Sequence, residues 1–270
     1  DGTAPGIKLM LPAADGWGNN MGSVVYALPG VPAEMRRMWD ETVSGDLKRA
    51  AGSKRVLRHR RLKCFGAGES AIEEMLPGII ERGRDPTVGI TAHEATITLR
   101  ISAWADNDDS CLEKISTTEN VIRETLGRIV YGEEDDEVED AAAAALLAAS
   151  KTLATVEAGT AGRVASLFAQ AAARRDRVGQ SFFHGGLVLP GLSVEKDSLI
   201  AAAKDVARSH NASIGMAVGP VRPIGTRHAV DVVVVKNDQP LVTEHILSGG
   251  GIAMSRAAKS AVDQVRLVLL

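Results

Sequence analysis

Residues 151–270 alternate apolar, strand-like runs with segments of helical periodicity, and this alternation restricts the possible folds most. "TLATVE" precedes the helix-like "RVASLFAQAAA", and "SFFHGGLVLPG" precedes the helix-like "KDSLIAAAKDVARSH". The strand-like "ASIGMAVGP", "HAVDVVVVKN" and "PLVTEHILSGG" follow, and "IAMSRAAKSAVDQVRLVLL" has the spacing of a closing helix. Strands that alternate with helices predict an α/β fold, here a three-layer sandwich.

Residues 47–132 predict an α+β module in β-α-β-β-α order, of the small RNA-binding-like type. A strand is expected in "KRVLRHRRLKCFG" and a helix in "ESAIEEMLPGIIERG". Polar and apolar residues alternate from Thr96 to Ile101, which is the period of a half-buried strand. A second helix is expected in "CLEKISTTENVIRETLGRIV".

Residues 1–46 predict a β-hairpin, with strands at Ile7 to Leu11 and in "SVVYAL", followed by a helix that begins at Pro32. This segment is too short for an independent hydrophobic core. The chain also opens with Asp1 instead of Met, directly in a glycine-proline loop. We therefore expect residues 1–46 to be the C-terminal fragment of a larger domain.

Residues 133–150 combine the acidic block "EEDDEVED" with the alanine-rich "AAAAALLAAS". Carboxylates in the first turn of a helix interact favourably with its dipole. We expect a linker helix whose acidic residues, Glu133 to Asp140, are solvated.

The composition argues against several classes of partner. The net charge is −3, the isoelectric point is near 6.1 and aromatic residues make up 3%, so neither nucleic acid nor a membrane is an expected partner. The two cysteines, Cys64 and Cys111, have no metal-ligand spacing, and reduced thiols in a cytoplasmic protein are expected. The histidines form no metal-binding pattern either, and His184, beside two glycines, is the most suggestive of them. We expect no metal and no cofactor.

The segment "VEAGTAGRVAS", Val156 to Ser166, predicts a strand that turns through two glycines and a threonine into a helix. Such a turn commonly holds an anion or an oxyanion on the amide groups of the helix N-terminus. A nucleophile usually accompanies it, but Ala158 and Gly159 stand where a Ser or Cys would be expected.

Three groups of short segments share the order of one known family. These are "GTAPGI" and "LPGVPAEM"; "GAGESAIEE", "PTVG", "LRISAWA" and "LGRIVYGEED"; and "TLATVEAGTAG", "FFHGGLVLP" and "IGMAVGPVRPIGTRHAVDVVV". The chain resembles the CinA (competence/damage-inducible protein A) family. The resemblance implies a molybdopterin-binding-like (MoCF-like) fragment at 1–46, a KH-like module at 47–132, a linker helix at 133–150 and an amidohydrolase-like domain at 151–270. Homodimerisation is a further expectation from the family.

The resemblance also implies hydrolysis of the carboxamide of nicotinamide mononucleotide to the acid and ammonia. In the family segment T-L-A-x-A-E-S-C-T-G-G the nucleophile is the Ser after Glu, and that position is Ala158 here. The family Tyr after G-G-V-V-A falls on Pro190, and the Lys five residues beyond it falls on Glu195. We therefore expect a catalytically impaired, nucleotide-binding member.

Two alternative activities stay open. The first is an active nicotinamide-nucleotide amidohydrolase with displaced catalytic groups, for which Thr160 is the weak substitute nucleophile. The second is metal-aided cleavage of ADP-ribose pyrophosphate, which the family's first domain is associated with and which would need residues upstream of Asp1.

The residues expected to bind a ligand of the nicotinamide mononucleotide type lie in the turns of residues 151–270. They are Glu157, Thr160, Gly162, Gly185, Gly186, Gly219 and Arg222. The glycines also have a structural explanation, because tight turns require them. Remnants of phosphate-binding loops are expected at Gly2, Thr3, Pro5, Gly6, Pro29, Gly30 and Glu34.

The segment "KRVLRHRRLK" is locally basic. Its cationic residues are Lys54, Arg55, Arg58, Arg60, Arg61 and Lys63. KH-type RNA binding uses a G-x-x-G loop between two helices, whereas "GAGES" has other spacing and follows a strand. We expect a solvated strand face and no RNA binding.

Overall fold

The computed structural model describes residues 4–11, 23–51, 55–175, 181–247 and 252–270. The chain divides into two compact units, Asp1–Arg55 and Val56–Leu270. The expected boundary after residue 46 lies inside a helix, Ser44–Ala51. The assignment of the four expected segments to family domains stays a prediction.

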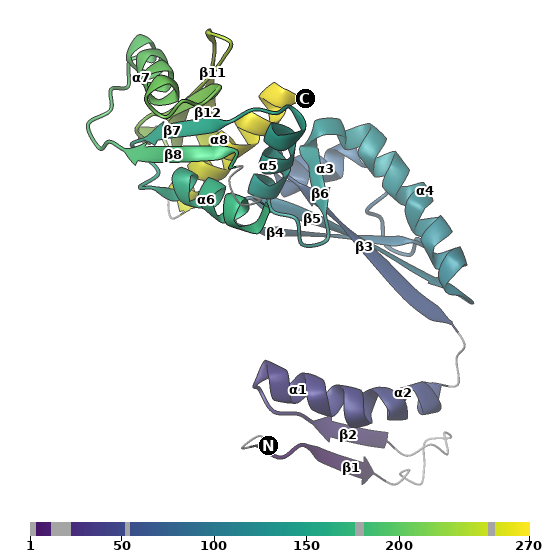
Figure 1. The fold of residues 1–270 in the computed structure, drawn as a ribbon. Helices are drawn as coiled ribbons and strands as arrows, with labels where there is room; N and C mark the ends of the chain where they lie inside the picture. Colours follow the sequence, from purple (N-terminus) through teal and green to yellow (C-terminus); the bar gives the residue numbers. More distant parts are fainter. Residues whose placement is uncertain (1–3, 12–22, 52–54, 176–180, 248–251) are drawn as a thin grey trace. The chain divides into compact units, whose positions relative to one another are not determined.

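The first unit is a two-stranded sheet with helices on one face (Figure 1). Strands β1 (Ile7–Leu11) and β2 (Ser23–Ala27) are antiparallel, as expected. They are followed by α1 (Pro32–Met38), the π-helical turn η1 (Trp39–Val43) and α2 (Ser44–Ala51). Asp46 of α2 accepts hydrogen bonds from Lys8 (2.5 Å) and Tyr26 (2.6 Å), so the helical layer covers that face of the hairpin.

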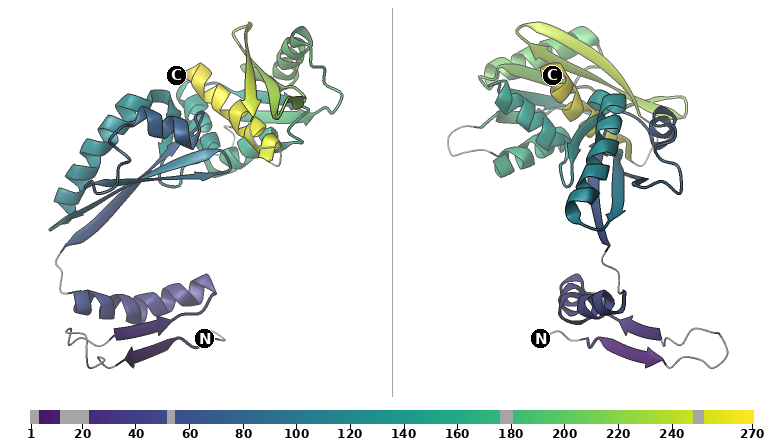
Figure 2. Two further views of the ribbon diagram at one scale, coloured as in Figure 1. Left: turned by 180° about the vertical axis from the view of Figure 1, so that it is seen from behind. Right: turned by 90° about the vertical axis from the view of Figure 1, so that its right-hand side faces the viewer.

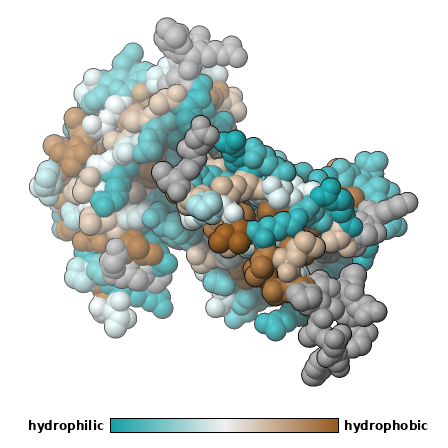
Figure 3. All heavy atoms as spheres, turned by 90° about the horizontal axis from the view of Figure 1, so that it is seen from below, coloured by the Kyte–Doolittle hydropathy of each residue, from teal (hydrophilic) through white to brown (hydrophobic). Residues whose placement is uncertain are grey.

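The other face of the hairpin is apolar and exposed. Ile7, Leu9, Leu11 and Val25 alternate with the helix-facing residues and are between 43% and 62% exposed. Figure 3, a space-filling view from below, shows hydrophobic residues in brown at the molecular surface. Among the described residues of this unit only Val43 is buried, which agrees with the expectation that so short a segment builds no core of its own.

The second unit begins with a four-stranded antiparallel sheet in the order β4-β5-β3-β6. Its elements are β3 (Val56–Cys64), α3 (Glu69–Met75), β4 (Thr87–His93), β5 (Thr96–Ala105), α4 (Asp108–Leu126), the 3₁₀ turn η2 (Gly127–Ile129) and β6 (Val130–Glu133). The predicted order is confirmed, and β6 extends it by one strand. Helix α3 ends at Met75, earlier than expected, because Pro77 and Gly78 (φ 72°) follow it.

Both cysteines lie in the core of this sheet, fully buried and unpaired. Burial raises the pKa of the Cys64 thiol to about 12. The Cys111 thiol contacts the carbonyl oxygens of Val56 and Ala103 at 3.3 and 3.4 Å. Both sulfur atoms are therefore inaccessible to a reagent in the folded protein.

We expect Ellman's reagent at pH 8 to leave both cysteines of the folded protein unmodified and to modify both in urea. The thiolate is the reacting form, folding buries both sulfur atoms, and burial also raises the pKa of the Cys64 thiol. Time courses of absorbance in buffer and in urea provide the measurement and its control. Fast reaction of two thiols without urea would contradict the buried positions.

The rest of the second unit is built around another sheet, whose strand order is β10-β11-β9-β7-β8, with β12 beside β11. The strands are β7 (Leu153–Glu157), β8 (Phe183–Val188), β9 (Ile214–Val218), β10 (Arg222–Ile224), β11 (Arg227–Lys236) and β12 (Gln239–Leu247). The helices are α5 (Val138–Ala148), α6 (Arg163–Arg175), α7 (Lys196–Ser209) and α8 (Ala253–Leu269). The predicted alternation is confirmed.

Helices cover both faces of this sheet, which makes it a three-layer α/β sandwich (Figure 1, Figure 2). On one face, Ile214, Met216 and Val232 pack against α5, α6 and α8. On the other, Ala217 and Val233 pack against α7. Among the described residues, no helix has both the length and the apolar character needed to cross a membrane.

Helix α5 was expected as a linker, but it belongs to the core of the sandwich. Val138, Ala142, Ala143 and Leu146 are fully buried against α6 and α8. Its alanine side chains are small and therefore allow this close helix packing. From the sequence, the acidic block before them instead predicts a solvated helix.

Helix α8 is buried from Ala257 to Arg266, because its two sides contact different parts of the second unit. Its apolar side lies in the sandwich core. On its polar side, Lys259 donates to the Thr96 hydroxyl at 3.3 Å, and Arg266 donates to the Arg128 carbonyl at 2.7 Å. These bonds join the sandwich to the four-stranded sheet.

Candidate functional site

The expected site lies at the carboxyl end of β7, the strand that is paired in parallel with both β8 and β9. The chain leaves β7 for α6 on one face of the sheet and leaves β8 for α7 on the other. Ligands of open α/β sheets bind where successive connections diverge in this way. Ala158 donates to the Val218 carbonyl (3.0 Å) and Leu189 to the Glu157 carbonyl (2.9 Å), so the three strand ends meet here.

The anion held by the turn after β7 is the carboxylate of Glu157 itself. The residue is fully buried, and its carboxylate accepts hydrogen bonds from four donors. These are the Thr160 hydroxyl and the backbone N–H groups of Gly162 (3.1 Å), Val164 (3.3 Å) and Ala165 (2.9 Å). A carboxylate at a helix N-terminus is a favourable cap.

The N–H groups that follow Thr160, which were expected to bind a ligand anion, have an acceptor within the turn in this structure. Three of these groups already donate to Glu157, and the Thr160 hydroxyl does the same in a fully buried position. The Thr160 hydroxyl donates its proton to the Glu157 carboxylate, and because Thr160 is fully buried its oxygen is not accessible to a substrate carbonyl. The ligand-binding role of Glu157, Thr160 and Gly162 stays a prediction, but their observed contacts are within the turn.

The turn also packs tightly against the segment after β9. A Cβ atom added to Gly159 would lie 2.3 Å from the Val221 nitrogen and 2.9 Å from the Gly219 carbonyl oxygen. Gly159 donates to that same oxygen at 3.3 Å. The glycine at 159 is therefore required by a close approach of two backbone segments.

The three replaced family positions lie around this edge of the sheet without forming a reactive group. Ala158 is half-buried and carries no hydroxyl. Pro190 is exposed in the loop after β8. Glu195 is exposed at the N-cap of α7, where its side chain forms no capping hydrogen bond. None of the three can act as the nucleophile, hydroxyl group or lysine expected from the family.

The glycines at 185 and 186 have packing explanations. Gly185 has φ 132°, a conformation that side chains disfavour, and a Cβ on Gly186 would lie 2.7 Å from the Ala165 Cβ. Beside them, the His184 ring bonds to the His210 carbonyl oxygen at 2.9 Å. Within the described ranges, no group of three or more His, Cys, Asp or Glu residues could hold a metal ion.

A cavity of about 450 Å³ lies between the start of α7 and strands β10, β11 and β12. We call it the acidic cavity. Its lining residues are Val194, Glu195, Lys196, Asp197, Arg222, Asp231 and Glu244. The structure thus brings Glu195 and Arg222, predicted separately from the sequence, to one cavity.

Arg222 does not present a free guanidinium to this cavity. It forms an ion pair with Asp231 at 2.7 Å and a second with Glu244. Two carboxylates therefore already neutralise the group that was expected to contact a ligand phosphate. Sequence reasoning missed Asp231 as a site residue, although one acidic residue inside the apolar run "HAVDVVVV" is a recognisable signal of a buried charge.

The expected phosphate-loop remnants lie at one end of the hairpin of the first unit. Ile7 pairs with Ala27, so Pro5 and Gly6 before β1 lie beside Pro29 and Gly30 after β2. Glu34 is in the first turn of α1, which is only seven residues long. Gly2 and Thr3 lie outside the described residues.

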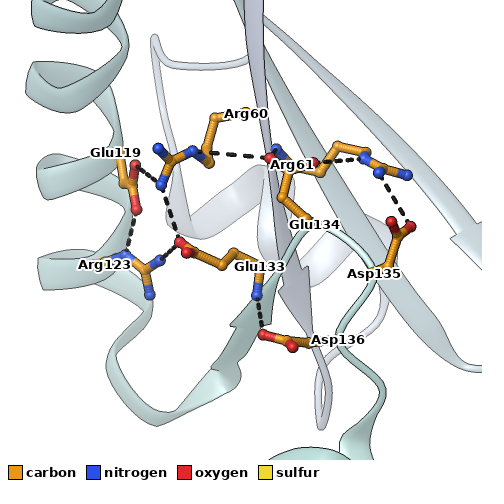
Figure 4. A network of polar contacts seen from close by, with 8 residues as sticks. All are labelled: Arg60, Arg61, Glu119, Arg123, Glu133, Glu134, Asp135 and Asp136. Carbon is orange, nitrogen blue, oxygen red and sulfur yellow. Dashed lines mark hydrogen bonds and ion pairs between the residues drawn. The ribbon is translucent and has the colours of Figure 1, made fainter.

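The basic segment of β3 is neutralised by carboxylates (Figure 4). Arg60 pairs with Glu133 (3.1 Å), and Arg61 pairs with Glu134 and Asp135 (both 3.1 Å). Arg58 pairs with Asp108 at 2.8 Å. Lys54 lies outside the described residues, Arg55 has an interaction partner and Lys63 is half-buried in β3. These ion pairs reduce the positive potential that RNA binding would need.

The acidic block is only partly solvated, because two of its carboxylates are buried and others form ion pairs. Its first carboxylates pair with the arginines of β3. Glu139 and Asp140 are buried, and Arg174 lies 3.5 and 3.0 Å from them. Burial raises the pKa of Glu139. Glu139 and Asp140 lie in the first turn of α5 as expected, and Asp140 also forms a capping box with Glu137.

These observations define a multidomain α/β protein with an antiparallel α+β module and a three-layer sandwich. Residues 59–132 match the model of the damage-inducible protein CinA KH domain. The chain is 32% identical over 281 residues to a CinA-like protein of Frankia casuarinae, which covers 98% of this chain and 61% of that protein. It is 29% identical over 296 residues to a CinA-like protein of Kosmotoga olearia, which covers 100% of this chain and 68% of that protein.

The chain belongs to the CinA family. It spans about three fifths of the length of the Frankia casuarinae relative. Among solved structures, a competence or damage-inducible protein from Enterobacter asburiae matches with a TM-score of 0.41 and 14% identity. That match covers 50% of this chain and 100% of the other.

Proposed function

We propose that this chain is a catalytically impaired member of the CinA family, whose C-terminal sandwich binds a small molecule without hydrolysing it. The observation that carries the proposal is the turn after β7. Ala158 stands at the nucleophile position, and the nearby Thr160 hydroxyl donates to the buried Glu157 carboxylate.

Amide hydrolysis needs a nucleophile, a base that takes its proton and donors for the oxyanion. At this edge of the sheet, Gly162, Val164 and Ala165 direct their N–H groups to Glu157, so they are not aimed at a substrate carbonyl. The position of the family lysine carries the negative charge of Glu195. All three requirements are weakened together, which favours loss of catalysis over a displaced mechanism.

The test is ammonia release from nicotinamide mononucleotide by the purified chain, followed with a coupled glutamate dehydrogenase assay. We expect no release above the enzyme-free blank, because the chain offers no activated nucleophile. Ala158→Ser is expected to stay inactive as well, since a serine without a base is a poor nucleophile.

Clear ammonia release by the unmodified chain would overturn the proposal and establish the alternative, an active amidohydrolase. Thr160→Val serves as the matched variant, because activity lost with it would assign the nucleophile to Thr160. The binding arm is isothermal titration calorimetry with the same nucleotide, which tests the expectation of nucleotide binding independently of turnover.

A further inference from the structure

Strand β8 forms one edge of the sandwich sheet (Figure 1). Among the described residues it pairs only with β7. At its end, Leu189 donates its backbone N–H to Glu157 of β7, and successive backbone groups of a strand point in opposite directions. The N–H and C=O groups of Gly186 and Val188 therefore point away from β7, and no described residue forms a hydrogen bond with them.

The same edge is apolar and carries no charge. From Ser181 to Val194 the sequence contains no Asp, Glu, Lys or Arg, although these residues make up 24% of the chain. Edge strands are usually protected from pairing by charged residues or proline, as β12 is at the other edge by Pro240 and the exposed Glu244. Strand β8 has neither. The apolar residues that are between 41% and 50% exposed here are Leu187, Val188, Leu189 and Val194.

The helix beside this edge leaves it accessible. Ala165 of α6 lies against Gly186, because a Cβ atom added to that glycine would be 2.7 Å from the Ala165 Cβ. Ala169 and Ala173 follow at intervals of four residues, so they lie on the same side of α6, and both are exposed. Side chains this small leave room for a second chain to approach β8.

Two copies of this edge fit each other in an antiparallel arrangement about a two-fold axis. When Leu187 of one copy lies opposite Leu187 of the other, each Gly186 lies opposite a Val188. Both of these residues direct their backbone groups outward, so each such pair exchanges two N–H···O=C bonds. Gly186 has no side chain and therefore does not crowd the Val188 opposite it.

A second copy of the chain is the partner that these features favour. The edge offers no charge with which to select a charged peptide. Pairing of β8 with itself satisfies the outward backbone groups and covers the apolar side chains of both copies at once, and the two-fold axis closes the assembly as a dimer. A standard interface buries about 800 Å² per partner. One strand edge with four apolar side chains is smaller, so we expect a dissociation constant in the micromolar range.

We propose that the chain forms a two-fold symmetric dimer by antiparallel pairing of its β8 edges, with Leu187 on the axis. The sheet then continues from one copy into the other. This inference goes beyond the proposed function, because it concerns assembly and holds with or without hydrolysis.

The first test is disulfide cross-linking of the full chain carrying Leu187→Cys, at about 100 µM under mild oxidation. Opposed residues of a non-hydrogen-bonded antiparallel pair have Cα atoms about 4.5 Å apart, which suits a disulfide. Because Cys64 and Cys111 are buried, the introduced thiol is the accessible one. We expect a covalent dimer on non-reducing gel electrophoresis. Leu241→Cys, at a β12 leucine that is 47% exposed, is the matched control and is expected to stay monomeric.

The second test is sedimentation velocity of the full chain at about 5 and about 200 µM, where we expect the dimer fraction to rise with concentration. Leu187→Lys places two positive charges on the axis, and Val188→Pro removes an outward N–H without altering the pairing with β7. Each is expected to weaken association by about tenfold or more. Leu241→Lys is expected to associate like the unmodified chain. Circular dichroism establishes that each variant is folded.

A chain that stays monomeric at about 200 µM would overturn the inference. A dimer of unchanged strength in Leu187→Lys and Val188→Pro would overturn it as well, because the copies would then meet through another face. Equal cross-linking of Leu187→Cys and Leu241→Cys would have the same meaning. Ammonia release from nicotinamide mononucleotide bears on the proposed function alone, so the two failures are distinguishable.

Discussion

Replacing Glu157 with alanine is expected to lower the free energy of unfolding by about 3–5 kcal/mol. The substitution removes the acceptor of four hydrogen bonds inside a fully buried site. It leaves a hydroxyl and three backbone N–H groups without a partner, and it deletes the negative charge at the N-terminus of α6. Urea denaturation followed by circular dichroism measures the effect.

Two variants sharpen this result. Glu157→Gln keeps one acceptor oxygen and is expected to lose less stability than Glu157→Ala. Glu195→Ala is the matched control at an exposed N-cap position without a side-chain capping bond, and it is expected to change stability by no more than about 0.5 kcal/mol. A loss below about 1 kcal/mol for Glu157→Ala would contradict the capping role.

Replacing Gly159 with alanine is expected to destabilise the sandwich by about 2–4 kcal/mol. The new Cβ would lie 2.3 Å from the Val221 nitrogen and 2.9 Å from the Gly219 oxygen, and both are backbone atoms that cannot rotate away. Relief requires the segment from Gly219 to Val221 to move away from the turn. Thermal and urea denaturation measure the loss.

The control for this substitution is Gly191→Ala, because a Cβ added to that exposed glycine meets no atom within 4 Å. Ala158→Ser, at the neighbouring position, is expected to fold normally. A loss of stability with Gly159→Ala alone would therefore be due to the backbone clash at position 159. Unchanged stability of Gly159→Ala would contradict the close approach. The family segment has Cys where this chain has Gly159, so restoring the family pattern would meet this backbone clash as well as the missing base.

The alternation of strands and helices was predictable because hydrophobic periodicity is a local property. The strand Thr96–Ala105 reads from the sequence as it appears in the structure, with alternate residues buried. The role of α5 was not predictable in the same way. Its acidic start suits a solvated helix, yet Asp140 pairs with Arg174, which lies 34 residues further along the chain. Spacing within a segment carries no information about such a partner.

The strand-turn-helix geometry after β7 was predictable from the sequence, but the contacts within the turn were not. The turn after β7 and the family positions Ala158, Pro190 and Glu195 were found from the sequence. The use of the Glu157 carboxylate was not, because a strand-turn-helix segment has room for an anion from a ligand or from the chain itself. Only the folded structure shows which anion is bound, and here it is the Glu157 carboxylate of the chain itself.

The Glu157 cap also explains why a residue can be retained without a retained catalytic activity. A residue that stabilises a fold is retained by selection for folding alone, whether or not the chemistry that once surrounded it survives. Glu157, Thr160 and Gly162 can therefore persist in a lineage that has lost its reaction. Their presence in a related sequence identifies the shape of the turn and gives no evidence of catalysis by itself.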